Sequence, residues 1–158
     1  MNRTQLKDLF EGIGFVAIVA SLVFVGIESR NSTKQAILTN QALEIASYQE
    51  LMTNIEAINT LAVESEAAAS VLSEIWGETG DLNRFRQTRA LYNLYRHGDM
   101  AYFMYERGAI GEDRLLSALA PLPLDTQIGR DFWDEHKHSF TGSYTNFIDE
   151  LIKSKNIL

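Results

Sequence analysis

The sequence predicts an all-α protein in which a single N-terminal transmembrane helix continues into a long stalk helix and packs with a bundle of shorter helices. Three observations lead to this fold class. An uncharged apolar run lies near the N-terminus, no Gly or Pro interrupts residues 28–76, and no segment alternates apolar and polar residues between hairpin turns. We divide the chain into a membrane-anchor helix at 1–30, a stalk helix at 31–62 and a helical body at 63–158.

The apolar run covers residues 13–27 and carries no charge. As a helix it spans about 22 Å, and extension back to Leu9 gives about 28 Å, close to the ~30 Å core of a bilayer. The extension includes Glu11, which is near enough to the membrane surface to reach the lipid headgroups. The run is apolar on every face, unlike a half-buried surface helix. We therefore expect residues 9–27 to form a single-pass anchor segment.

Two other interpretations of the run remain open. A cleaved signal peptide needs small residues at the cleavage site, but the segment after the run, VGIESRNS, has no A-x-A pattern. The run could instead be the central helix of a soluble all-α oligomer that buries residues 13–27 between copies. The positive-inside rule gives no orientation, because two cations precede the run (Arg3, Lys7) and two follow it (Arg30, Lys34).

Two features could join copies of the chain. Gly14, Ala17 and Ser21 share one helix face, and small residues let another helix approach closely, although they also occur in apolar helices without that role. The second feature is an apolar seam at 38–62, which needs either the C-terminal helices or the same helix of another copy as its partner. The seam consists of Leu38, Ile45, Tyr48, Met52, Ile55 and Ala62, interrupted by Gln41 and Asn59.

Capping and breaking residues bound the helices of the body. An N-cap residue begins the first two, at Ser65 and Asp81, and a glycine follows each, at Gly77 and Gly108. Pro121 and the proline two residues later end the third. The predicted helices cover residues 65–76, 81–107, 112–119, 126–138 and 143–153.

The second of these helices carries an aromatic-rich face formed by Leu82, Phe85, Leu91, Leu94, Tyr95, Tyr102 and Tyr105. Asp99 and His97 lie close to it, and we expect Asp99 to be a satisfied polar group beneath a tyrosine layer. The next helices should contribute Ile128, Phe132 and Trp133, then Phe147, Ile148, Leu151 and Ile152. We expect these rings to form the core. The alternative is a small-molecule sensor or enzyme with a pocket among Tyr92, Tyr95, Tyr102, Tyr105 and Trp133.

Charge argues against a nucleic-acid-binding role. Lys and Arg number 14 against 21 Asp and Glu, a net charge of −7, whereas phosphate binding needs a cationic surface. Residues 28–80 carry a net −6 and residues 81–108 a net +2. This reversal favours two helices whose charges face each other or water over a basic binding strip at 84–96.

No residue pattern indicates catalysis, a cofactor or a metal, so we predict a non-enzymatic protein. The chain has no Cys, which excludes thiolate chemistry and disulfides. The one cluster that suggests metal ligands is Asp134, Glu135, His136 and His138, but His136 and His138 are two residues apart and point to different sides of a helix. We name no catalytic, cofactor-binding or metal residue.

Four segments carry a family resemblance. They are FVGIESRNSTKQA at 24–36, RFRQTRAL at 84–91, MAYFMYERGAIGEDRL at 100–115 and a G-R-x-x-W element at 129–133. Over most of the chain this order resembles an uncharacterised family of short bacterial proteins common among aquatic proteobacteria. Ser65-Glu66 stands where relatives often carry Asn-Pro, and Phe132-Trp133 where paired tryptophans are more usual. The resemblance implies a membrane-anchored helical protein and no activity, cofactor or site residue.

These features together predict a protein of the bacterial inner membrane, anchored through residues 9–27. We expect its role to be protein–protein interaction or self-assembly, with copies of the chain joined through Gly14, Ala17, Ser21 and the 38–62 seam. The alternatives are the soluble oligomer and the tyrosine-lined sensor described above.

Overall fold

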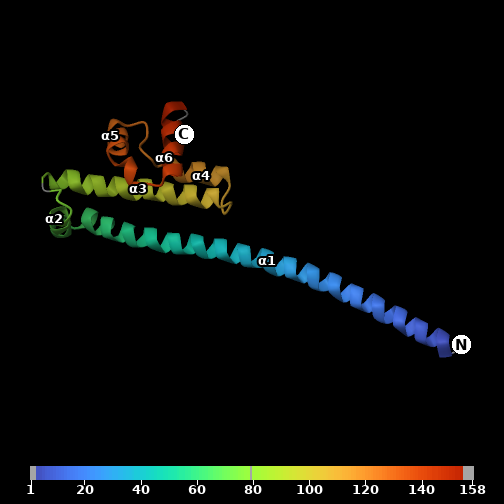
Figure 1. Ribbon diagram of the computed structural model, residues 1–158. Coiled ribbons are helices and arrows are strands. Elements are labelled where there is room, and N and C mark those ends of the chain that lie inside the picture. The colour runs from blue at the N-terminus through green and yellow to red at the C-terminus, as the bar shows by residue number, and fades with distance from the viewer. Residues whose placement is uncertain (1–2, 79, 155–158) are drawn as a thin grey trace. The chain divides into compact units, whose positions relative to one another are not determined.

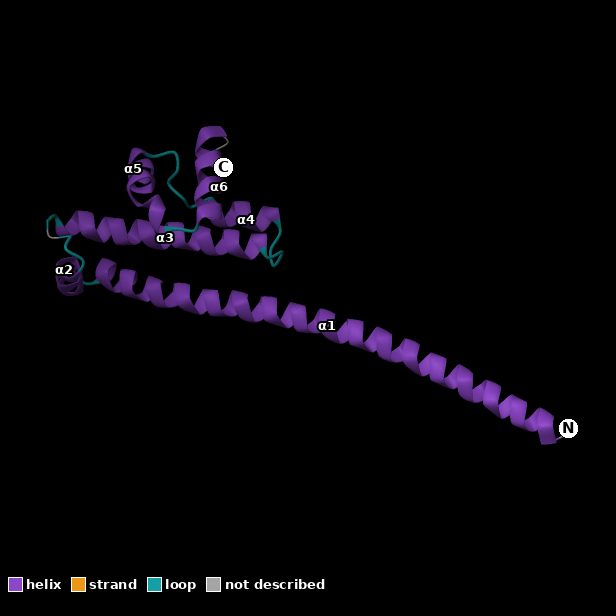
Figure 2. Cartoon of the chain, viewed as in Figure 1, coloured by secondary structure: helices purple, strands orange, loops and turns teal. Residues whose placement is uncertain are grey.

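The computed structural model describes residues 3–78 and 80–154, and the side chains of residues 4–11 are not among the parts described. The described residues form six α-helices and one short 3₁₀ helix, and they contain no strand (Figure 2). The all-α prediction is confirmed. The chain divides into two compact units, residues 1–44 and 45–158.

The first helix, α1, covers Arg3–Glu64 without a break (Figure 1). The anchor and the stalk are thus one helix, as predicted, and the helix is long and apolar enough to cross a membrane. Every residue from 12 to 40 is exposed. The contact of Glu11 with headgroups lies outside the described side chains. The helix ends because Ser65 takes an extended backbone conformation and caps the next helix.

The predicted caps of α2 (Glu66–Ile75) and α3 (Leu82–Glu106) are confirmed. The Ser65 hydroxyl accepts a hydrogen bond from the Ala68 amide, and the Asp81 carboxylate accepts from two amides of the first turn of α3. Gly77 and Gly108 have φ angles of 71° and 69°. This left-handed conformation is open to glycine at little cost, so each glycine ends its helix.

Three further α-helices complete the 45–158 unit: α4 (Glu112–Leu119), α5 (Gln127–His136) and α6 (Gly142–Ser154). The helix predicted at 126–138 is shorter than expected, because residues Lys137–Ser139 form a 3₁₀ turn, η1. Gly129 in α5 lies so close to the preceding loop that a Cβ there would meet the Pro123 carbonyl oxygen at 1.9 Å. This glycine allows α5 to pack directly on the loop.

Within the 45–158 unit, helix α3 lies between residues 45–64 of α1 and helices α5 and α6 (Figure 1). The main core forms where α3 meets α4, α5 and α6. At its centre Tyr95 stacks on Trp133 with ring centroids 5.2 Å apart, and the Tyr95 hydroxyl donates to the Gly129 carbonyl at 3.0 Å. A smaller cluster of Ala62, Ala69 and Phe85 joins α1, α2 and α3.

Three residues that we expected to face inward are exposed: Leu94, Tyr105 and Ile128, with 39%, 38% and 49% of their surface accessible. The inward face of α3 is narrower than the apolar pattern suggests. It follows Tyr95, Gly98 and Tyr102, so that Leu94, one position before Tyr95, turns away from α5 and α6. Tyr105 lies on the same side of α3 as Tyr102, but next to the last residue of the helix, Glu106, where its ring is partly uncovered.

Candidate functional site

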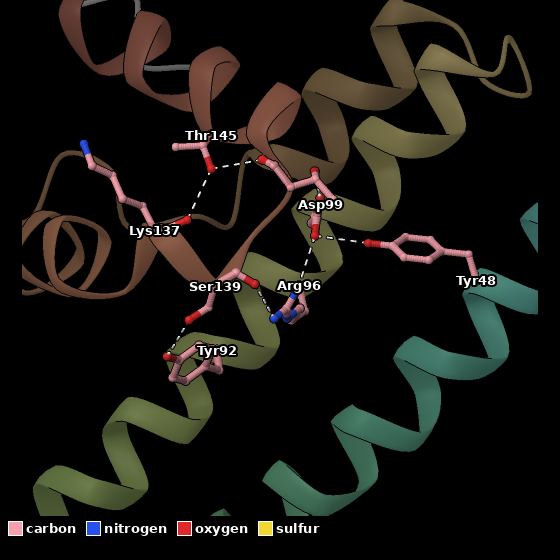
Figure 3. A network of polar contacts seen from close by, with 8 residues as sticks. Tyr48, Tyr92, Arg96, Asp99, Lys137, Ser139 and Thr145 are labelled. Carbon is pink, nitrogen blue, oxygen red and sulfur yellow. Dashed lines mark hydrogen bonds and ion pairs between the residues drawn. The ribbon is translucent and has the colours of Figure 1, made fainter.

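Asp99 is a carboxylate almost completely removed from solvent, with 1% of its surface exposed. The Tyr48 hydroxyl donates to its Oδ2 at 3.1 Å (Figure 3). The Thr141 hydroxyl donates to its Oδ1 at 2.9 Å. Arg96 Nη1 lies 3.4 Å from the same Oδ2. Asp99 therefore joins α1, α3 and the loop before α6. The prediction of a satisfied polar group is confirmed.

The electrostatics of this cluster are set by burial. Burial raises the pKa of Asp99 above its ordinary value, and the hydrogen bonds from Thr141 and Tyr48 and the charge of Arg96 oppose that shift without cancelling it. Burial and the neighbouring Asp99 charge raise the pKa of Tyr48 to about 12. Tyr48 therefore remains a hydrogen-bond donor at neutral pH.

The arginines of α3 bind groups inside the unit. Arg96 Nη2 donates to the Ser139 carbonyl at 2.7 Å, and its guanidinium lies 4.5 Å from the Phe140 ring centroid. Arg86 donates from Nε to the Val63 carbonyl at 3.1 Å, and Arg89 forms an ion pair with Glu78. Only Arg84 of the 84–96 set is widely exposed, at 77% of its side chain. These arginines stabilise the unit and do not form an open basic strip.

The second half of the seam packs on α3. Met52, Asn59 and Ala62 are buried, and the rings of Tyr48 and Phe103 have centroids 4.5 Å apart. Of the two partners that the sequence allowed, the C-terminal helices therefore cover this part of the seam. Leu38 lies in the other unit and is exposed.

The tyrosine-rich residues lie mostly within the core. Tyr95 and Trp133 are fully buried, and Tyr92 and Tyr102 pack against the same cluster. Tyr92 stands edge-on to Phe132 with centroids 5.0 Å apart, while the exposed Tyr105 contacts Tyr102. Rings packed against one another in this way form a hydrophobic core, in agreement with the interpretation that we favoured.

A groove runs between α1 and α3, and we call it the α1/α3 groove. It has two adjoining parts of about 320 Å³ and about 460 Å³, which share Glu56 and His97. The α1 wall consists of Gln49, Met52, Thr53, Glu56, Thr60, Val63 and Glu64. The α3 wall consists of Ala90, Asn93, Leu94, Arg96, His97 and Met100, and Ala118, Pro121 and Leu122 close one end.

The α1/α3 groove is apolar at its α4 end and acidic along its α1 wall. Asn93 Nδ2 donates to the Thr60 hydroxyl at 3.0 Å, but its buried Oδ1 has no partner among the described residues. His97 Nδ1 lies 4.0 Å from Glu56 Oε2. No ion pair joins Glu64 to any residue that the structure describes. No sequence pattern indicates this groove, because its walls come from three segments that no spacing rule connects.

The remaining sequence candidates are not brought together. Among the described residues no three His, Asp or Glu side chains are placed to hold a metal ion. His136 instead packs on the rings of Tyr92 and Phe132, and His138 lies in the 3₁₀ turn. Gly14, Ala17 and Ser21 lie on α1 in its exposed segment.

Comparisons with protein-family models, with curated proteins and with solved structures found no match to this chain. The function must therefore be argued from the geometry above.

Proposed function

We propose that this chain is a single-pass protein of the bacterial inner membrane, anchored through residues 9–27, and that its 45–158 unit serves protein–protein interaction. One observation carries the proposal. The ten large apolar side chains between residues 13 and 27 have 44–68% of their surface exposed. Covering them contributes on the order of 10 kcal/mol, and lipid is a solvent that can cover every face of a helix at once.

Two features support an anchor over a buried helix or a signal peptide. The core helix of a soluble protein is mostly buried by its own chain, whereas the most apolar window of α1 is not buried at all. A signal peptide needs small residues at its cleavage site, whereas the segment after the apolar run, VGIESRNS, has no A-x-A pattern. The non-enzymatic role rests on the environment of the polar groups, since Asp99 and the arginines of α3 are engaged in holding the unit together.

Fractionation of cells that express the full chain tests the anchor. We expect the chain in the membrane pellet, resistant to alkaline carbonate, released by detergent and with residues 1–27 still attached by mass. The double variant Ile18→Arg/Leu22→Arg should leave the membrane, because each Arg at the centre of a span costs about 3 kcal/mol. The matched control Leu38→Arg, on the same helix, should stay.

The soluble oligomer is the second candidate and gives the opposite result. The chain would then appear in the soluble fraction without detergent, and light scattering would show a small, defined oligomer. Loss of residues 1–27 would instead contradict both candidates and indicate a signal peptide.

A further inference from the structure

We propose that the α1/α3 groove binds a basic amphipathic helix of another protein, which places two cations seven or eight residues apart against Glu56 and Glu64. This inference rests on the proposed interaction role and names the chemistry of the partner.

The charge of the groove wall is the first argument. Residues 45–80, which include all of α2 and the part of α1 in this unit, contain six Glu and no Lys or Arg. No arginine of α3 pairs directly with Glu56 or Glu64 among the described residues, because Arg86 and Arg96 donate to the carbonyls of Val63 and Ser139. Among the described residues Glu64 has no ion-pair partner and Glu56 has only the His97 ring, 4.0 Å away. Arg96 also lines the groove, but its guanidinium is paired with Asp99. A ligand of this surface should be positively charged.

The shape of the groove is the second argument. Its α1 wall extends from Gln49 to Glu64, about 22 Å at 1.5 Å per residue, which matches a helix of four turns. Glu56 and Glu64 are about 12 Å apart along that wall, so a helix lying parallel to α1 meets both with cations spaced seven or eight residues apart. The same groove offers apolar contacts to the residues around those cations. They are Met52, Val63, Leu94, Met100, Pro121 and Leu122.

The rim of the groove extends this pattern onto the outside of α1. Ala57 and the exposed Leu61 line a shallower hollow that shares Glu56, Thr60 and Glu64 with the groove. Carboxylates flanked by apolar surface on both sides suit a partner whose cations project from an apolar face. Docking an amphipathic helix into a groove in this way is a common mode of recognition.

A second copy of this chain fits the surface less well. The 45–158 unit contains 17 Asp and Glu against 10 Lys and Arg, so it carries the whole net charge of −7 while residues 1–44 are neutral. Two such units repel each other at long range, and most arginines of α3 are already engaged inside the unit. A basic partner gains from the same field.

The test is a selection of displayed 18-residue helical peptides on the full chain in lipid nanodiscs, after depletion on empty nanodiscs. Enriched peptides should carry Lys or Arg pairs seven or eight residues apart, next to apolar residues. Their affinity should fall about tenfold for Glu56→Gln/Glu64→Gln, as expected for two partly exposed ion pairs. The control Glu66→Gln/Glu74→Gln removes the same charge from exposed positions on α2 and should bind as the parent chain does.

Several results would overturn the inference. They are a selection without binders, enriched peptides without the cation pair, equal losses for the two double variants, or competition by an unlabelled second copy of the chain. The fractionation experiment tests membrane attachment independently of peptide binding. A failure of peptide binding therefore leaves the proposed anchor intact, and a failure of attachment is detected before any peptide is added.

Discussion

The contact between Gly98 and Tyr144 allows a quantitative prediction about how α3 and α6 pack. A Cβ at Gly98 would lie 2.3 Å from Tyr144 Oη, 3.1 Å from Leu119 Cδ2 and 3.2 Å from Tyr144 Cζ. Tyr144 is fully buried and its hydroxyl has no partner among the described residues. The Tyr144 hydroxyl therefore leaves room only for glycine at position 98, although this hydroxyl makes no hydrogen bond there.

The substitutions Gly98→Ala and Tyr144→Phe should therefore be strongly coupled. Alanine favours the helix over glycine by about 1 kcal/mol, but overpacking against a buried ring costs roughly 2–3 kcal/mol, so Gly98→Ala should destabilise the unit by about 1–2 kcal/mol. Tyr144→Phe removes a buried, unpaired hydroxyl and should leave stability equal or raise it by about 1 kcal/mol. The double variant should recover about 1–2 kcal/mol of the loss, because the remaining contacts need shifts of only a few tenths of an ångström.

Denaturant unfolding of the full chain in a mild nonionic detergent measures this coupling. The fluorescence of Trp133 reports on the unit, since this ring is buried and has its centroid 5.8 Å from that of Tyr144. Additive effects of the two substitutions on the free energy of unfolding would contradict this coupling. The coupling is also refuted if Tyr144→Phe alone lowers the free energy of unfolding by more than about 1 kcal/mol, because the hydroxyl would then be well satisfied.

Two further predictions concern the same unit. Gly129→Ala should destabilise the unit by about 3 kcal/mol or more, because the added Cβ meets the backbone carbonyl of Pro123, and no truncation of a side chain relieves that clash. Denaturant unfolding measures this loss of stability, and a loss below about 1 kcal/mol would contradict the prediction. The pKa of Asp99 is raised in the folded state, so the native state binds this proton more tightly than the unfolded chain does. The contribution of Asp99 to the free energy of unfolding is therefore greatest at acid pH. It falls as the pH rises from about 4 through the raised pKa. The difference in unfolding free energy between the parent chain and Asp99→Asn should therefore shift against the parent chain as the pH rises, and the opposite slope would show that Arg96 and the hydroxyl donors outweigh burial.

The helices were predictable because local chemistry determines where they begin and end. Ser65 and Asp81 supply side-chain oxygens to the first amides of their helices, and Gly77 and Gly108 supply the left-handed conformation that ends them. These effects act over four or five residues, so the sequence contains all that they need. The apolar run of α1 is predictable for the same reason, because its composition does not depend on what it packs against.

The partners of Asp99 were not predictable, although its burial was. Thr141 is 42 residues and Tyr48 51 residues away along the chain, and no local pattern marks either as a hydrogen-bond donor to this carboxylate. The exposed positions of Leu94 and Tyr105 were missed for a related reason. An apolar residue marks a face that is able to pack, whereas the neighbouring helices decide which part of that face is covered.

The charge pattern shows how such non-local effects bear on function. Opposite net charges on 28–80 and 81–108 favour ion pairs between the two segments, and Arg89 forms one with Glu78. Arg86 and Arg96, in contrast, donate to backbone carbonyls. A carbonyl oxygen satisfies the hydrogen bonds of a guanidinium and holds it in place, so that the arginine does not pair directly with a carboxylate. Arg86, Arg89 and Arg96 are consequently bound inside the unit, while Glu56 and Glu64 at the groove have no arginine partner among the described residues. The same arrangement that holds the unit together leaves its groove suited to a basic ligand.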